Sequence, residues 1–434
     1  ALARQHRFAD VLTAAGQQMS GAPGILSTSG AADILSAALD ALPESDSGQR
    51  AILLAHLSWT PPYCADNERV ANLLTDAQRY ADVSGYAAKR TVLRAKLYYA
   101  GGPNDHDQAL AIAGEMERML SARDPMQRAR WSLEPQMARI VTLLQRGDVA
   151  HARRVVDAFG SAAQELNHAE LLWHYERMLV VMRMNVGEFD DAKLRLTELK
   201  ARAERLNLHA RRALEAIDWG ELIRQTTDIT AVAAQLAGPL RLDAADCPTV
   251  RAYKLQALTR LGLIEEAGAA LQAVSIQDLY ALPRSRDYLA TLGYLAFTSA
   301  ETGSVTHAKA LYELLLPYPH FFVASLSCHC QGVVSHFLAI LARTLGERAR
   351  ALSHFEDALI DQARLGLHPQ LAQTRFELAR TLSDSQALED RERALALLQD
   401  VRDTAHQLGM APLGAAAEKL VRELEPASAA TRVS

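Results

Sequence analysis

Residues 335–359, SHFLAILARTLGERARALSHFEDAL, contain the pattern that decides the fold. Apolar residues recur every three or four positions on both sides of Gly346, which predicts two amphipathic helices. Glycine adopts the left-handed conformation without steric cost, so Gly346 is expected to end the first helix. Ala351, five residues later, lets the second helix approach the first closely. The stretch therefore predicts an antiparallel pair of helices.

The same pattern recurs along the chain. A glycine followed five residues later by an alanine is also found at Gly147/Ala152, Gly187/Ala192, Gly262/Ala267 and Gly303/Ala308. Successive glycines are 40, 75, 41 and 43 residues apart, and Asp228/Ala233 falls within the longest interval. Weaker copies fit the frame near Ala32, Ala71, Ala109 and Ala394. A period of about 40 residues indicates about ten stacked helix pairs, each burying its apolar face only against its neighbours.

Strand signals are nearly absent, because no β-branched alternation is sustained and no Asn-Gly hairpin occurs. A chain of 434 residues is also longer than one hydrophobic core usually organises, as a repeat array can be. We therefore predict an all-α solenoid of antiparallel helix pairs over residues 1–423, followed by a disordered tail over residues 424–434.

Composition limits the function classes. The net charge is −5 and the isoelectric point is about 6.3, so nothing favours binding to nucleic acid or to a membrane surface. Four cysteines in a chain of this length indicate a reducing compartment, and no apolar run is long enough to cross a bilayer. We expect a cytoplasmic protein. The absence of an initial methionine is typical of a fragment of a longer chain.

The repeated residues resemble the tetratricopeptide repeat. Within 335–359, six residues fall on the signature spacings of that family: Leu338, Ala339, Gly346, Ala351, Phe355 and Ala358. The resemblance implies a right-handed superhelix with a concave groove. The period is longer than the usual one of the family and is closer to the longer repeats of regulatory ATPases.

A second resemblance is to the C-terminal repeat region of large bacterial signal-transduction ATPases and transcriptional regulators of the maltose-regulator type. Three segments carry it: LPRSRDYLATLGYLA (282–296), ALYELLLPY (310–318) and RERALALLQDVRDTAHQLGM (391–410). It implies a non-enzymatic sensor joined to ATPase and output domains in the same full-length chain. The sequence has no Gly-x4-Gly-Lys-Ser/Thr phosphate loop, so this region is not itself the ATPase.

The first resemblance also predicts a ligand site. In tetratricopeptide stacks, certain positions of each first helix line the concave groove. Counted back from the anchor glycines, the residues predicted to contact an effector are Tyr99, His174, Arg177, Gln256, Arg260, Phe297, Glu301, His336 and Arg343. Lys89, Lys96 and Asn185 fall in the same groove. Such side chains suit a polar or anionic small molecule or a peptide, or they are simply the solvated face of the solenoid.

The crowded patch Cys328-His329-Cys330, with His336 nearby, raises the question of a metal site. Gly346 predicts a helix over about residues 324–344, on which Cys328 and Cys330 lie about 200° apart. They could not then face one ion, and Cys64 and Cys247 offer no second ligand pair. We predict no metal, no cofactor and buried thiols. No nucleophile motif or glycine-rich phosphate cradle occurs, so we expect no enzyme.

Two functional hypotheses follow. In the first, the chain is a ligand-sensing or protein-interaction module of a multidomain signalling ATPase or transcriptional regulator, with its effector or partner on the concave face. In the second, it is a freestanding tetratricopeptide scaffold that docks protein partners.

Overall fold

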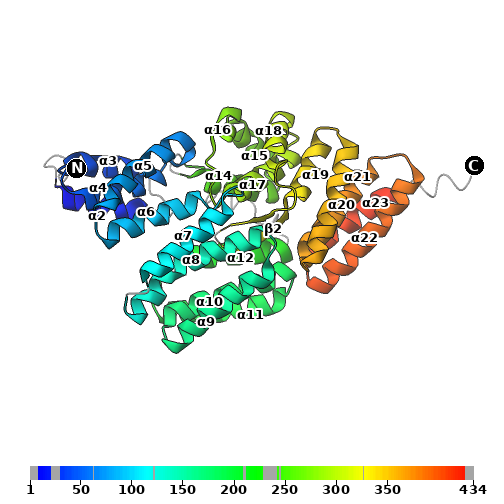
Figure 1. The fold of residues 1–434 in the computed structure, drawn as a ribbon. Helices are drawn as coiled ribbons and strands as arrows, with labels where there is room; N and C mark the ends of the chain where they lie inside the picture. The colour runs from blue at the N-terminus through cyan, green and yellow to red at the C-terminus, as the bar shows by residue number, and fades with distance from the viewer. Residues whose placement is uncertain are drawn as a thin grey trace, which may run out of the picture.

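The computed structural model describes residues 8–20, 30–61, 63–120, 123–208, 212–227, 242–243, 246–325 and 327–425. Within these ranges the fold is all-α, as predicted, apart from one sheet of two short strands. The molecule is elongated, with the N-terminal and C-terminal helices at opposite ends (Figure 1). The repeat copy at Asp228/Ala233 lies outside the described residues. Of the tail predicted over residues 424–434, Leu424 still belongs to the last helix, and residues 426–434 lie outside the described ranges.

The N-terminal helices pack in sequence order, each against the next. They are α2 (Ala9–Ser20), α3 (Ala31–Ala41), α4 (Ser47–Ser58), α5 (Asn67–Asp82), α6 (Tyr86–Tyr99) and α7 (His106–Leu120), with a short 3-10 helix η1 (Tyr63–Ala65) before α5. Asp46 and Asp66 begin α4 and α5 by accepting hydrogen bonds from backbone N–H groups three residues later. Both helices therefore begin with a side-chain cap.

Two further groups of helices occupy the middle of the molecule (Figure 1). The lower group consists of α8 (Pro125–Gln145), α9 (Val149–Glu165), α10 (Ala169–Val186), α11 (Phe189–Arg205) and α12 (Arg212–Thr226). The upper group consists of α14 (Pro248–Arg260), α15 (Ile264–Gln272), α16 (Ile276–Ala281), α17 (Tyr288–Glu301) and α18 (Val305–Leu315). Segments that are distant in sequence therefore lie side by side at the centre of the molecule.

The strands β1 (Phe322–Ala324) and β2 (Cys330–Val333) follow α18 and pair antiparallel. The C-terminal group then comprises α19 (Val334–Thr344), α20 (Arg348–Arg364), α21 (His368–Ser383), α22 (Leu388–Leu408) and α23 (Ala411–Leu424). One buried hydrophobic cluster runs from Trp173 on α10 through α14, α17, α19 and α21 to Ala417 on α23. The upper and C-terminal groups therefore share a continuous core.

The repeat pattern correctly locates the turns inside five helix pairs. Each anchor glycine lies between two helices with positive φ: 74° at Gly147, 96° at Gly187, 77° at Gly262, 68° at Gly303 and 76° at Gly346. The five paired alanines, at 152, 192, 267, 308 and 351, are each fully buried. Both parts of the predicted turn chemistry are confirmed at these positions.

The helix predicted over residues 324–344 is wrong in its first part. Residues 322–324 and 330–333 are strands, and α19 begins only at Val334. Pro317 and Pro319 interrupt the preceding helical pattern, and Gly332 has a φ of 121° that no α-helix contains. The angle of about 200° between Cys328 and Cys330 therefore does not apply, since Cys328 lies in a loop with a φ of 67°.

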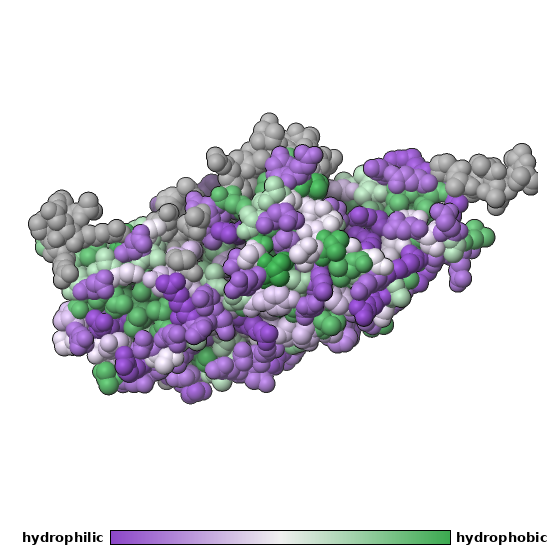
Figure 2. Space-filling model, turned by 90° about the horizontal axis from the view of Figure 1, so that it is seen from above, coloured by the Kyte–Doolittle hydropathy of each residue, from purple (hydrophilic) through white to green (hydrophobic). Residues whose placement is uncertain are grey.

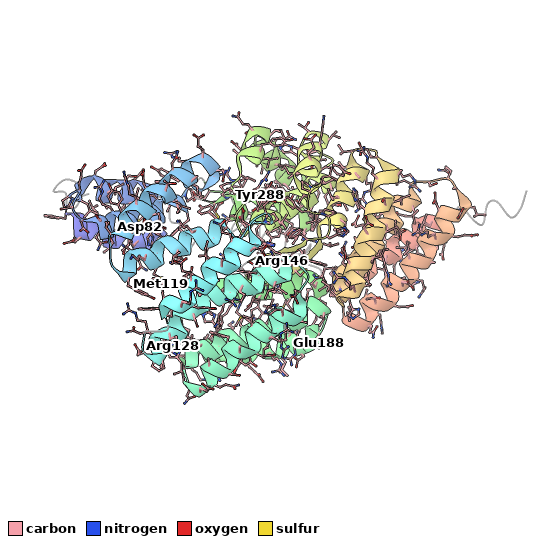
Figure 3. The ribbon with its side chains drawn as sticks, viewed as in Figure 1. Asp82, Met119, Arg128, Arg146, Glu188 and Tyr288 are labelled. Carbon is pink, nitrogen blue, oxygen red and sulfur yellow. The ribbon has the colours of Figure 1, made fainter. Side chains whose placement is uncertain are left out.

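Side chains of the lower group hold this loop in place. Gln145, at the end of α8, donates hydrogen bonds from Nε2 to the carbonyl oxygens of Arg286 and Ala324, at 2.8 and 2.9 Å. Asn185, near the end of α10, donates to the Cys328 carbonyl at 3.0 Å and accepts from the Cys330 N–H at 2.9 Å. Figure 3 shows α8 running from Arg128 at the lower edge to Arg146 in the middle of the molecule. The helix thereby carries Gln145 to the centre.

Figure 2 shows polar residues over most of the face seen from above, with small apolar groups scattered among them. Single large apolar side chains such as Leu194 and Ile360 are exposed, which is ordinary for a folded protein. In the part of the chain that the structure describes, no helix combines the length and apolar character required to cross a bilayer.

The turn between α6 and α7 also contacts the upper group, which offers a test of the fold. A Cβ atom on Gly102 would lie 1.7 Å from the carbonyl oxygen of Arg284, a backbone atom that cannot rotate away. Gly102→Ala should therefore lower the free energy of unfolding by about 1–3 kcal/mol or more, as overpacking does. Urea denaturation of the whole chain measures the change.

Gly114→Ala is the matched control for that substitution. Gly114 lies inside α7, and its added Cβ would meet only the Arg118 side chain at 3.5 Å. Alanine in a helix interior should stabilise the chain by about 0.5–1 kcal/mol. Equal effects of the two substitutions would contradict the contact between Gly102 and Arg284.

Candidate functional site

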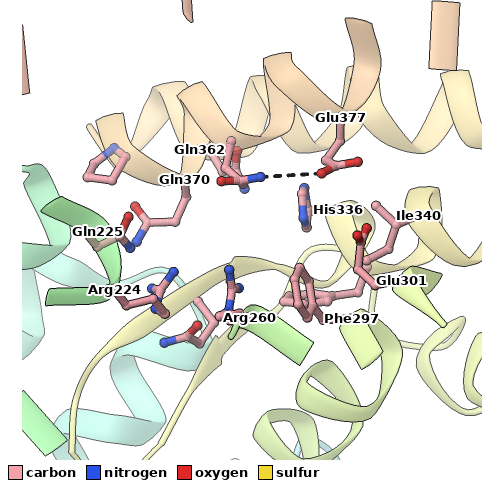
Figure 4. Close-up of a pocket in the computed structure, with 14 residues that line it drawn as sticks. Arg224, Gln225, Arg260, Phe297, Glu301, His336, Ile340, Gln362, Gln370 and Glu377 are labelled. Atoms are coloured by element: carbon pink, nitrogen blue, oxygen red, sulfur yellow. Dashed lines mark hydrogen bonds between the residues drawn. The ribbon is translucent and has the colours of Figure 1, made fainter. Parts of the chain in front are cut away.

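A cavity opens where α12 and the upper group meet the C-terminal helices. The space between its lining atoms is about 550 Å³ when the open mouth is included, of which about 30 Å³ admits the centre of a water-sized sphere. Residues of α12, α14, α17, β2, α19, α20 and α21 line it. Figure 4 shows Arg224, Arg260, Phe297 and Glu301 on one side of the cavity, and Gln362, Gln370 and Glu377 on the other. Helices of the lower, upper and C-terminal groups therefore all contribute to its wall.

Four of the nine predicted effector residues lie in this lining: Arg260, Phe297, Glu301 and His336. Arg260 ends α14, Phe297 and Glu301 lie on α17, and His336 lies in the first turn of α19. Counting from the anchor glycines therefore selected residues of three successive first helices that the fold brings together.

The other five predicted residues lie elsewhere. Gln256 is buried at 2% exposure, one turn before Arg260, and Arg343 is half-buried and bonded to Glu377 behind the cavity wall. His174 and Arg177 are buried on α10. Arg177 donates a hydrogen bond to the Ser327 carbonyl and does not face an open groove. Tyr99 donates a hydrogen bond to the Ser58 carbonyl at 2.6 Å in the N-terminal group. The alternative that these positions form a solvated face is therefore wrong for His174, Arg177 and Gln256, which are buried.

Arg260 is the unusual side chain of the cavity. Its guanidinium lies 4.0 Å from the centre of the Phe297 ring. No hydrogen bond or salt bridge joins it to any described residue, and its Nε is buried without a partner. Burial lowers the pKa of Arg260 to about 9, and the charge of Arg224 acts in the same direction. Arg260 remains a cation at neutral pH.

The other charged groups around the cavity are paired. Arg224 donates two hydrogen bonds to Glu221, at 2.9 and 2.7 Å. Burial raises the pKa of Glu221, but the charges of Arg224, His329 and Arg260 together with the Arg224 hydrogen bonds outweigh it and leave that pKa at about 2. The remaining acids pair with arginines behind the wall: Glu377 bonds to Arg343 at 2.7 Å and to Arg380 at 3.2 Å, and Glu301 bonds to Arg380 at 3.1 Å. Arg260 is thus the one lining cation without an anion in hydrogen-bonding contact among the described residues.

A chain of hydrogen bonds fixes the tautomer of His336. Thr374 Oγ1 donates to Gln362 Oε1 at 2.8 Å, which uses the only hydroxyl proton of the threonine. His336 Nδ1, 2.9 Å from the same hydroxyl, must then be the donor, so Nε2 carries a lone pair. Burial lowers the pKa of His336 to about 4, so the ring is neutral at physiological pH.

The cavity also contains side-chain amides that sequence reasoning did not select. Gln362 is fully buried and its Nε2 has no partner, while Gln370 donates from Nε2 to the Cys330 carbonyl at 2.7 Å and leaves Oε1 without one. Gln370 lies on α21, which ends at Ser383 with no anchor glycine from which to count. Gln362 lies on the second helix of its pair, outside the positions considered.

A second polar cluster fastens α10 and α12 to the loop before β2. Arg177 Nε and Nη2 donate to the Asp218 carboxylate at 2.7 and 2.6 Å, and His329 Nε2 lies 2.9 Å from the same carboxylate. Burial raises the pKa of Asp218, but Arg177 and His329 outweigh it and hold that pKa below its ordinary value. Arg177 and His329 thus serve internal packing.

The cysteine patch is buried in this seam. Burial raises the pKa of the Cys328 and Cys330 thiols to about 11, so both are protonated at neutral pH. Across the residues that the structure describes, no group of three or more His, Cys, Asp and Glu side chains is arranged to hold a metal ion. His329 is engaged by Asp218 and His336 by Thr374.

Comparisons with known proteins assign no role to the cavity. No protein-family model matches the chain, and no curated protein is significantly similar to it. The interpretation of the cavity therefore depends on its own residues, distances and charges.

The seam predicts a large effect of removing Arg177. Arg177→Met should leave the buried Asp218 carboxylate without its arginine partner, and breaking a buried ion pair typically costs about 3–5 kcal/mol. Arg183→Met on the same helix removes a surface pair with Glu188 and Asp191 and should cost about 0–1 kcal/mol. Urea denaturation compares the two, and similar losses would contradict the buried seam.

Removing Arg260 is expected to change the free energy of unfolding in the opposite direction. Because no anion within the described ranges contacts its guanidinium, Arg260→Met should leave the free energy of unfolding unchanged or raise it. Arg343→Met, which removes a bonded partner of the buried Glu377, should lower it by roughly 3 kcal/mol. The melting temperatures of the two variants test this, and a fall in Arg260→Met as large as that in Arg343→Met would show that Arg260 is structural.

Proposed function

We propose that this chain is a non-enzymatic sensor module whose cavity binds a small effector. The observation that carries the proposal is the cation of Arg260, which lies over Phe297 in a cavity where none of the described acidic residues is in contact with it. Natural cores rarely keep such a charge without a partner, and perturbed ionisable groups gather at functional sites. A bound effector would supply the missing partner.

The finer description of the fold belongs to the same proposal. We infer a right-handed superhelix of tetratricopeptide-type pairs, similar to the repeat region of bacterial signalling ATPases and transcriptional regulators. The support is the glycine and alanine pattern at five helix turns. ATPase and output domains in the same full-length chain would then receive the signal.

The position of the cavity suggests how binding could act at a distance. Arg224 comes from the lower group, Arg260 and Phe297 from the upper group, and Gln370 from the C-terminal group. A ligand that contacts all three stabilises the arrangement in which these groups are held together. It shifts the population of that arrangement by its difference in affinity for the two states. The relative position of the two ends of the chain is thereby coupled to effector concentration.

The scaffold alternative has less support. A docking scaffold needs an open groove, yet Arg177 and Asn185 bind the backbone of the chain's own segment 327–330. The residues predicted for that part of the groove are therefore already occupied.

A thermal-shift screen of the whole chain against a metabolite library tests the proposal. Ligand at a hundredfold excess over Kd adds about 2.7 kcal/mol of stability, which raises Tm by a few degrees. At least one compound should stabilise the wild type but not Gln373→Trp, because Gln373 lines the cavity and a tryptophan there fills it.

Gln399→Trp controls for the substitution itself, since Gln399 is exposed on α22. It should respond to ligand as the wild type does. The proposal fails where no compound stabilises the chain, or where every stabilising compound acts equally on Gln373→Trp.

A further inference from the structure

We propose that the cavity selects a small carboxylate that carries a single negative charge and hydroxyl groups. This inference rests on the proposed function and adds the chemical class of the effector. It is drawn from the charge balance of the cavity and from the hydrogen-bonding atoms that have no partner there.

The charge balance comes first. Among the described residues, the cavity lining and its ion-pair partners contain four arginines, at 224, 260, 343 and 380, and three glutamates, at 221, 301 and 377. His336 is neutral because burial lowers its pKa to about 4. One positive charge is therefore in excess, and since no described residue forms a hydrogen bond or ion pair with Arg260, that excess lies on its guanidinium. A ligand with one negative charge restores the balance.

The geometry of Arg260 favours a carboxylate. The Cζ atom of Arg260 lies over the Phe297 ring, 4.0 Å from its centre, a distance typical of stacking. Stacking uses the face of the planar group and leaves its edge of N–H donors for a second partner. Two parallel hydrogen bonds from that edge match the two oxygens of a carboxylate.

The remaining unpartnered atoms call for hydroxyl groups. Gln362 Nε2 is a buried donor without an acceptor, and Gln370 Oε1 is a buried acceptor without a donor. His336 Nε2 is a second acceptor, since Nδ1 carries the ring proton and Nε2 bonds to no described residue. A hydroxyl both donates and accepts, so hydroxyls beside the carboxylate can satisfy atoms of both kinds.

Other small metabolites fit less well. A neutral sugar satisfies the amides but leaves Arg260 unpaired. An amino acid brings an ammonium group, yet Glu221, Glu301 and Glu377 are already bonded to arginines. A phosphate dianion brings one negative charge more than the cavity has in excess. Of these four classes, the hydroxylated monocarboxylate matches both the single excess charge and the unpartnered atoms.

Isothermal titration calorimetry of the whole chain tests this class with matched pairs. The probes are lactate, glycerate, threonate and gluconate, each beside its neutral primary amide, which has the same shape and no charge. We expect at least one acid to bind the wild type about tenfold or more tightly than its amide, the usual effect of hydrogen bonds to a charged group. Arg260→Gln should remove that preference, and Gln399→Trp should keep it.

The outcomes separate this inference from the function on which it rests. Acids and amides that bind equally, with binding lost in Gln373→Trp, would leave the sensor cavity in place and overturn the anion class. If no acid binds, the proposed carboxylate class is wrong as well. The library screen then remains the test of whether the cavity binds any effector. Acid binding that persists in Gln373→Trp would overturn both.

Discussion

The arrangement of the helical groups depends on the buried hydrogen bonds that α8 and α10 make to the loop before β2. Backbone groups in a buried loop have no regular ladder to satisfy them, and each one left unpaired costs about 1–3 kcal/mol. Gln145 and Asn185 supply partners to Ala324, Cys328 and Cys330. Because β2 runs directly into α19, these bonds also determine where α19 and its His336 lie. The helices α8 and α10 thus help to position α19, a wall of the cavity, although they do not line the cavity themselves.

The chemistry of the cavity follows from the ends of helices that meet there. Arg224 lies in the last turn of α12, and Arg260 is the last residue of α14. The carbonyl ends of helices favour cations, which brings two guanidinium groups toward one space. Glu221, one turn before Arg224, neutralises the first of them. The equivalent position before Arg260, three residues earlier, is Ala257, and the residue before that is Gln256, so no acid lies one turn before Arg260. The presence of an acid one turn before Arg224 and its absence before Arg260 therefore decide which cation has no anion in contact.

The sequence predicted the parts of this structure that depend on neighbours in the chain. Glycines with positive φ and alanines at helix contacts are local requirements, and the five turns they predict are present. The β1–β2 segment could not be found this way, because its conformation depends on Gln145 and Asn185, which are more than 140 residues away. The same limit applies to the cavity. Repeat positions identified Arg260, Phe297, Glu301 and His336, but Gln362 and Gln370 enter only through the packing of α20 and α21.

The stacking of Arg260 on Phe297 is too weak to explain by itself why a cation occupies the cavity. A cation–π contact contributes about 0.5–2 kcal/mol, whereas removing a guanidinium from water costs several kcal/mol unless an anion or hydrogen bonds replace the lost hydration. The lowered pKa of Arg260 shows the same imbalance, since burial and Arg224 outweigh the more distant charges of Glu221, Glu301 and Glu377. A methionine or leucine would fill this position and pack against Phe297 without the cost of removing a charge from water. The arginine is therefore better explained by a partner that comes and goes than by the stability of the fold, as is general for groups that stabilise a complex at the expense of the free protein.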